Sequence, residues 1–175
     1  MKRFLTLAVL LATAVTLTGF FDGNKFEREV EMEKVAAKLA RDAQRGGYNL
    51  VTTEELKGWM DAGRDMVVVD TMPYEDSYLK GHIPGARQFL FPIPDMVEWE
   101  TAETDGKTRD DFAALLGADK TKTVVIYCGF VKCTRSHNGA AWARELGYEN
   151  VYRHPGGIYA WRGADYPVET GDDEF

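Results

Sequence analysis

The residues best suited to chemistry lie in one short segment, YCGFVKCTRS, at residues 127–136. Its two cysteines, Cys128 and Cys133, are the only cysteines in the chain, and two basic residues, Lys132 and Arg135, accompany them. A thiolate beside positive charge is a strong nucleophile. Three interpretations are open: a structural disulfide, part of a metal site, or a reactive thiol in a loop that binds anions.

The elements around this segment favour the reactive thiol. The apolar run TVVIY at 123–127 predicts a buried strand, and SHNGAAWARELG at 136–147 predicts a helix. Ligands of open parallel sheets bind at the carboxyl ends of the strands, often at a helix N-terminus. Loop amides and the helix dipole are therefore expected to lower the pKa of Cys128 from about 8.5 towards neutrality.

Helices and strands alternate along the rest of the chain. TTEELKGWMDAG at 52–63 begins with a capping-box pattern, MVVVD at 66–70 is an apolar run that ends in an aspartate, and TRDDFAALLG at 108–117 is a second capped helix. A short strand is expected at 150–153, followed by the turn PGG. This alternation predicts an α/β domain with a parallel sheet.

Length and charge limit the remaining possibilities. The chain has 175 residues, of which 45% are hydrophobic and 28% charged, as expected for one domain with a sizeable core. Its net charge is −7, with an acidic tail at 169–175 and no basic run. Nucleic acid is therefore excluded as an expected partner.

The N-terminal residues suggest export. Lys2 and Arg3 precede an apolar stretch, so residues 1–20 are expected to be a signal peptide, or an anchor that tethers the protein to a membrane if it is not cleaved. The folded part would then be periplasmic or otherwise exported, in an oxidising compartment. Residues 24–46 predict an additional helix, which either packs on the domain or acts as a solvated spacer.

Three segments carry a family resemblance: DTMPYEDSYLKGHIPGARQF, VVIYCGFVKCTRS and LGYENVYRHPGGIYAW. In this order and spacing they resemble the rhodanese-type sulfurtransferase domain, here assigned to residues 48–168. The resemblance implies a five-stranded parallel sheet flanked by helices. It also implies that Cys128 carries sulfur as a persulfide and that no metal or organic cofactor is needed.

The sequence departs from the family pattern near the cysteine. Many members have an arginine five residues after the catalytic cysteine, where this chain has Cys133, and Arg135 follows two positions later. Members often have an arginine two residues after the strand-end aspartate, where this chain has Met72. The Cys-to-Arg spacing also differs from that of the phosphatase relatives, so phosphate chemistry is not expected.

The resemblance implies a sulfurtransferase that moves sulfane sulfur from thiosulfate or polysulfide to a thiol or cyanide. Arg135 and Lys132 would hold the donor's sulfonate oxygens. Asp70 is expected to position the loop by hydrogen bonds, and His82 to be a hydrogen-bonded turn residue rather than a base. The hydroxyls of the loop would cap the helix or donate hydrogen bonds. The substrate-binding loop comprises Gly129, Phe130, Val131, Lys132, Cys133, Thr134, Arg135 and Ser136.

Other functions remain open at this level. Cys128 and Cys133 could act as a thiol–disulfide redox pair, with Cys133 as the resolving thiol that protects Cys128 from irreversible oxidation. The domain could instead carry or bind sulfane sulfur without turnover. A metal site made of both cysteines and His137 is less favoured, because the spacing fits no familiar zinc pattern.

Overall fold

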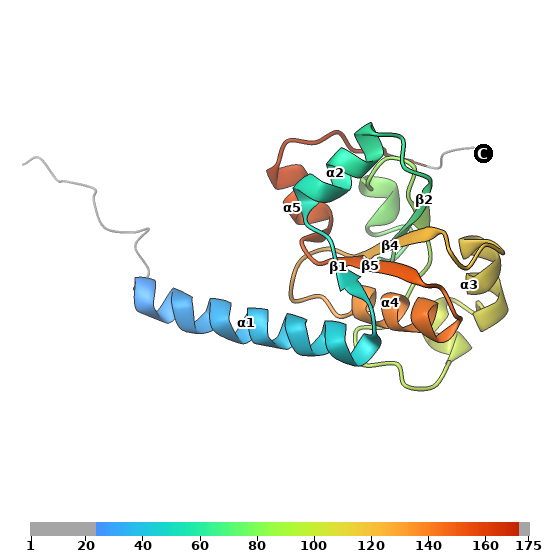
Figure 1. The fold of residues 1–175 in the computed structure, drawn as a ribbon, viewed down its shortest axis with the longest axis horizontal. Coiled ribbons are helices and arrows are strands. Elements are labelled where there is room, and N and C mark those ends of the chain that lie inside the picture. The colour runs from blue at the N-terminus through green and yellow to red at the C-terminus, as the bar shows by residue number, and fades with distance from the viewer. Residues whose placement is uncertain (1–23, 172–175) are drawn as a thin grey trace, which may run out of the picture. The chain divides into compact units, whose positions relative to one another are not determined.

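The structure is a computed structural model that describes residues 24–171, so the predicted signal at 1–20 and the last residues of the acidic tail lie outside the described residues. Figure 1 shows the arrangement of its elements. The helices are α1 (Lys25–Gly46), α2 (Thr53–Asp61), α3 (Arg109–Leu116), α4 (Arg135–Glu145) and α5 (Gly157–Gly163). The strands are β1 (Asn49–Leu50), β2 (Met66–Asp70), β3 (Arg87–Gln88), β4 (Thr123–Tyr127) and β5 (Asn150–His154).

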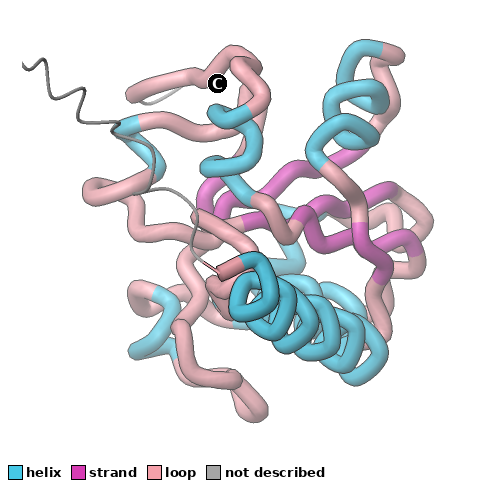
Figure 2. The backbone as a smooth tube through the Cα atoms, turned by 90° about the vertical axis from the view of Figure 1, so that its left-hand side faces the viewer, coloured by secondary structure: helices cyan, strands magenta, loops and turns pink. Residues whose placement is uncertain are grey.

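The five strands form one parallel sheet in the order β1-β5-β4-β2-β3. Strand β4 lies at the centre, where Ile126 is in register with Val69 of β2 and with Arg153 of β5. Figure 2 shows the strands with helices and loops on either side. The predicted α/β fold with a five-stranded parallel sheet is confirmed, and the loop after β4 leaves the sheet at its middle.

Alternate side chains of β4 pack into separate cores on the two faces of the sheet. Val124 and Ile126 join a cluster with side chains from α3 and α4, whereas Val125 and Tyr127 join one with side chains from α2 and α5. Figure 1 shows these helix pairs on opposite sides of the sheet. Burial on both faces explains why β2 and β4 read as continuous apolar runs.

Capping boxes fix the starts of two predicted helices. The Thr52 side chain accepts from the Glu55 amide at 3.2 Å, and the Glu55 carboxylate accepts from the Thr52 amide at 2.9 Å. Thr108 and Asp111 form the same arrangement before α3. Both helices therefore begin where the sequence predicted.

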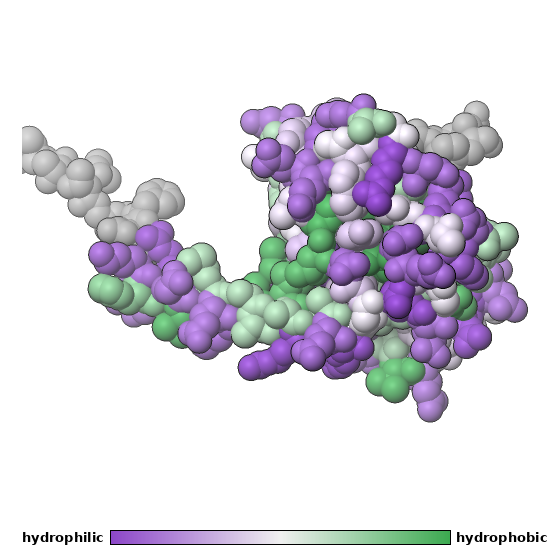
Figure 3. Space-filling view, viewed as in Figure 1, coloured by the Kyte–Doolittle hydropathy of each residue, from purple (hydrophilic) through white to green (hydrophobic). Residues whose placement is uncertain are grey.

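The chain divides into two compact units, Met1–Lys34 and Val35–Phe175. Within the second unit, the last turns of α1 pack on the domain, because Ala43 contacts the core cluster beside α4 and Asp42 is buried. The outer surface is mainly hydrophilic in the view of Figure 3. Among residues 24–171, no helix combines the length and the apolar character that a membrane crossing requires.

Candidate active site

The thiol of Cys128 lies beneath the loop that joins β4 to α4. Cys128 follows the last residue of β4 and is 0% exposed. Its Sγ lies 3.2 Å from the hydroxyl of Ser136 and 3.4 Å from the carbonyl oxygen of Cys133. The loop thus closes over the thiol, which sits at the end of the central strand.

The second cysteine faces the first. Cys133 is 8% exposed, both cysteines are free thiols, and the two thiol groups interact closely enough to shift each other's pKa. Burial, and then the hydrogen bond and charge of Cys133, raise the pKa of Cys128 well above its usual value. The hydrogen bond from Cys128, together with the amides of Arg135 and Gly129, lowers the pKa of Cys133 to about 6. The interaction between the two thiols thus favours the charged form of Cys133 over that of Cys128.

This distribution of charge corrects a prediction. The pKa of Cys128 was expected to fall because loop amides would surround its sulfur. Instead, the amides of Gly129 and Arg135 stabilise the sulfur of Cys133, while burial of Cys128 disfavours its charged form. The electrostatic effect is the predicted one, but it acts on the other cysteine.

Arg153 was not predicted from the sequence. It is a buried arginine that donates hydrogen bonds to the cysteine loop. Its Nε donates to the Ser136 hydroxyl at 2.9 Å, and its Nη2 donates to the carbonyl oxygen of Cys133 at 2.8 Å and to that of Val131 at 3.4 Å. Arg153 belongs to β5, next to β4 in the sheet. Arg153 fixes the loop's carbonyl groups and places positive charge near the thiol pair.

The positive charge of Arg153 has polar partners near the end of α1. Its Nη1 lies 3.8 Å from the carboxylate of Asp42 and 3.5 Å from the Tyr48 hydroxyl. A buried charge requires such partners. The available sequence signal was a basic residue inside NVYRH, an otherwise strand-like segment beside the cysteine strand.

Two hydroxyl residues at the end of the loop have contacts that the sequence did not predict. Thr134 stands at the N-cap of α4, but its hydroxyl donates to the carbonyl of Ile93 and makes no capping bond. Ser136 lies inside α4 and bonds Cys128 and Arg153. The capping interpretation is therefore wrong for both hydroxyls, since other acceptors and donors engage them.

Arg135 binds the neighbouring segment of the chain. Its Nη1 donates to the carbonyl oxygen of Phe91, while its amide and charge lower the pKa of Cys133. Lys132 is exposed on the same loop. Contacts of Arg135 and Lys132 with a donor's oxygens stay a prediction.

Asp70 and His82 support the site from β2 and the segment after it. Asp70 accepts hydrogen bonds from the Met72 amide at 2.9 Å and from the Tyr127 hydroxyl, so it holds the segment after β2. The ring of His82 bonds the Tyr78 carbonyl at 3.0 Å and stacks on the Tyr78 ring at 3.9 Å. These contacts agree with a hydrogen-bonded structural role for His82.

Burial raises the pKa of Asp70 to about 6 from 3.8. The folded chain therefore keeps a proton that the unfolded chain releases between pH 4 and 6. We expect this group to lower the free energy of unfolding by up to about 3 kcal/mol as the pH rises through that window. Urea unfolding of the parent and of Asp70→Asn at several pH values should show the parent losing stability relative to the variant across this window, because other titrating groups such as His137 and His154 contribute equally to both. Parallel profiles would contradict the assignment.

The turn before α5 closes the other side of the cysteine loop. The amide of Ile158 donates to the carbonyl of Cys128, and that of Tyr159 to the carbonyl of Gly129, each at 3.0 Å. Gly157 has φ +58°, and a Cβ there would collide with the Cys128 carbonyl. The PGG turn thus requires glycine because two backbones approach each other closely.

Gly157→Ala should disrupt this contact. The left-handed conformation alone costs about 1–3 kcal/mol for a residue with a Cβ, and the collision displaces the cysteine loop, so both stability and sulfur loading should fall. Gly163→Ala, in the same helix but with nothing within 4 Å of an added Cβ, is the matched control and should leave both nearly unchanged. Equal behaviour of the two variants in unfolding and loading assays would refute this role of Gly157.

Other features of the described residues lie apart from the thiol pair. The His137 ring hydrogen-bonds the Tyr48 hydroxyl at 2.8 Å and Arg45 of α1 at 2.9 Å, so both ring nitrogens have partners away from the thiols. No group of three or more metal-binding side chains is found within residues 24–171. Beside the rim of the loop, the exposed rings of Phe130 and Tyr159 stack at 5.5 Å.

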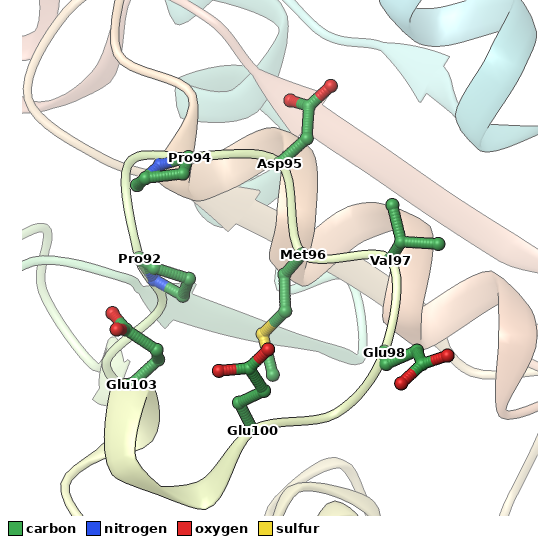
Figure 4. A pocket seen from close by; sticks show the side chains of 8 residues that line it. All are labelled: Pro92, Pro94, Asp95, Met96, Val97, Glu98, Glu100 and Glu103. Carbon is green, nitrogen blue, oxygen red and sulfur yellow. The ribbon is translucent and has the colours of Figure 1, made fainter.

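A separate pocket of about 330 Å³ lies in the segment before α3 (Figure 4). Its lining contains four carboxylates and no basic residue, so it would repel the sulfur anions expected at the cysteine loop. The lining residues are Pro92, Pro94, Asp95, Met96, Val97, Glu98, Glu100 and Glu103. We assign this pocket no part in the site.

The fold and the cysteine loop define the class of protein. The sequence model of the rhodanese-like domain matches residues 52–164, and the chain belongs to this family. Within it, the chain is 29% identical over 143 residues to "Putative thiosulfate sulfurtransferase SseB" of Mycobacterium tuberculosis, covering 73% of this chain and 49% of that protein.

A second curated relative and a solved structure are also similar to this chain. "Probable adenylyltransferase/sulfurtransferase MoeZ" of the same organism is 24% identical over 144 residues, covering 78% of this chain and 31% of that protein. The chain thus spans half or less of these two curated relatives. The crystal structure of the BH2092 protein from Bacillus halodurans has the same fold, with a TM-score of 0.55 and 21% identity over 80% of this chain and 93% of that one.

Proposed function

We propose that this protein is a sulfurtransferase that moves sulfane sulfur from thiosulfate or polysulfide to a thiol or cyanide, through a persulfide on Cys128. The observation that carries the proposal is the buried thiol of Cys128 at the end of the central strand, bonded to the Cys133 carbonyl beneath a loop held by the buried cation of Arg153. Membership of a family that includes sulfurtransferases supports the same chemistry.

The pair supplies the nucleophile without a separate base. The Cys133 thiolate accepts the hydrogen bond of the Cys128 thiol, so it can take that proton as Cys128 attacks the outer sulfur of thiosulfate. The new bond joins Cys128 Sγ to the sulfane sulfur, the S–S bond of thiosulfate breaks, and sulfite leaves with the electron pair. Loop amides and Arg153 favour the negative charge throughout.

In the second half-reaction an external thiol or cyanide attacks the outer sulfur of the persulfide and restores Cys128. The same loop then accommodates the returning thiolate. We also propose that the reaction takes place outside the cytoplasm, on the basis of the signal pattern at residues 1–20. Fractionation of the producing cells would test that location.

A turnover assay tests the proposal. Protein incubated with thiosulfate and cyanide should produce thiocyanate and sulfite in equal amounts, and a dithiol should replace cyanide as the acceptor. No sulfur transfer from thiosulfate or from inorganic polysulfide, with either acceptor, would overturn the assignment. Conversion to a disulfide with no release of sulfite would instead favour the second candidate, a thiol–disulfide redox protein, which the facing thiols also support.

A further inference from the structure

The two thiols are placed so that the second can reach the sulfur atom of the first. The loop turns back on itself, because the amide of Cys133 donates to the carbonyl of Phe130 at 2.9 Å. The Cys128 thiol donates to the carbonyl of Cys133 at 3.4 Å, so residue Cys133 lies directly against Cys128, and the two thiol groups interact. Cys133 therefore lies beside the inner sulfur of any persulfide formed on Cys128.

Burial gives the two sulfur atoms of that persulfide different neighbours. Cys128 is 0% exposed, so in its persulfide the outer sulfur, which the donor has delivered, stands between Sγ and an acceptor from solution. An external thiol therefore meets the outer sulfur first, and its attack transfers that sulfur. A thiol that attacks the inner sulfur has to come from inside the loop, and Cys133 is already in contact with it.

We propose that Cys133 attacks the inner sulfur of the Cys128 persulfide and expels the outer sulfur as sulfide, leaving a Cys128–Cys133 disulfide. The inference rests on the proposed function, since it starts from the persulfide, and it adds a second product. The protein would thereby reduce sulfane sulfur to sulfide as well as transfer it.

The step balances in atoms and electrons. The bond between the two cysteine sulfurs forms, and the bond between Cys128 Sγ and the sulfane sulfur breaks. The sulfane sulfur departs with the electron pair as the hydrosulfide ion, HS−. The sulfane sulfur gains two electrons, which the two cysteines supply on becoming a disulfide. The proton that Cys133 took from Cys128 leaves with the sulfide. A dithiol reductant from solution then reopens the disulfide by thiol–disulfide exchange.

The environment of Cys133 suits this role. The largest cause of its lowered pKa, the hydrogen bond of the Cys128 thiol, is lost when Cys128 becomes a persulfide, but the amides of Arg135 and Gly129 still favour its thiolate.

A single-turnover experiment without external thiol tests the inference. The full chain is reduced, freed of reductant and mixed anaerobically with thiosulfate labelled with a sulfur isotope in its outer position. Sulfite, labelled sulfide and the intact protein mass are then measured. We expect one sulfite and close to one labelled sulfide per chain, with loss of two hydrogens from the protein.

Cys133→Ser and Cys133→Ala provide the comparison. Both should release sulfite, retain the label as a stable persulfide, and yield at least about tenfold less sulfide than the parent over the same time. Since Cys133 also accepts the proton of Cys128, loading of the variants is followed to completion before sulfide is compared. Unfolding curves check that the variants are folded.

The outcomes separate the two proposals. Sulfite with a persistent persulfide in the parent, or equal sulfide release by parent and variants, would overturn the inference and leave the sulfurtransferase assignment intact. Absence of sulfite and of bound label from the parent would overturn the proposed use of thiosulfate, and the inference with it. Labelled sulfide and an intramolecular disulfide in the parent alone would support both.

Discussion

Replacing Cys128 by serine is expected to reduce sulfur transfer by more than about a thousandfold, because the covalent route through a persulfide is lost with its nucleophile. The fold should survive. Serine has nearly the same shape, and the Ser136 hydroxyl and the Cys133 carbonyl remain as hydrogen-bond partners for its hydroxyl. We expect the free energy of unfolding to change by no more than about 1.5 kcal/mol.

Thiocyanate production and urea unfolding, measured on the same preparations, test this expectation. Turnover by Cys128→Ser within tenfold of the parent would show that Cys133 or another group carries the sulfur. Loss of the cooperative unfolding transition would show that the thiol at the end of β4 is a structural requirement. Either result would contradict the role assigned to Cys128.

The second large effect is expected at Arg153. Arg153→Met removes a buried cation that bonds Ser136 and the carbonyls of the cysteine loop, and it leaves Asp42 without that neighbour. Breaking a buried ion pair costs about 3–5 kcal/mol where it leaves an unpaired charge, but Asp42 keeps Lys38 and Arg45 as partners, so the cost here is that of the lost hydrogen bonds, about 1–3 kcal/mol. The free energy of unfolding should fall by this amount, and persulfide loading should fall with it because the loop loses its anchor.

Two control variants separate charge from geometry. Arg153→Lys keeps the charge near Asp42 but not the planar group that reaches several acceptors, so stability should recover in part while loading stays low. Arg109→Ala removes an exposed arginine of α3 and should change stability by less than about 0.5 kcal/mol. If Arg153→Lys loaded sulfur as fast as the parent, the hydrogen-bonding geometry of Arg153 would be unimportant.

Much of the fold could be predicted from the sequence because long elements carry strong patterns. The apolar runs of β2 and β4 and the two capping boxes identified four elements and their starts. Strands β1 and β3 have two residues each, too few for any periodicity, and only pairing with their neighbours defines them. Their presence was implied by the family resemblance and not by the residues.

The position of the site could be predicted from the sequence, but the pKa order of its two thiols and the buried charge beside them could not. The strand-end location of Cys128 followed from the apolar run before it. Which sulfur is buried more deeply depends on the turn at Phe130 to Cys133, and that turn has no signature in the sequence. Arg153 was missed because a basic residue in a short strand is normally exposed, and its buried partner Asp42 lies more than a hundred residues earlier.

The most direct test of the account is to find which sulfur atom takes up the label. Cys133→Ser and Cys128→Ser are exposed to thiosulfate labelled in its outer sulfur, quenched with an alkylating agent and analysed by peptide mass spectrometry. The account predicts one added labelled sulfur on Cys128 in the first variant and none in the second. Label on Cys133 of the Cys128→Ser chain, or label on a residue other than Cys128 in the Cys133→Ser chain, would contradict the claim that Cys128 carries the persulfide.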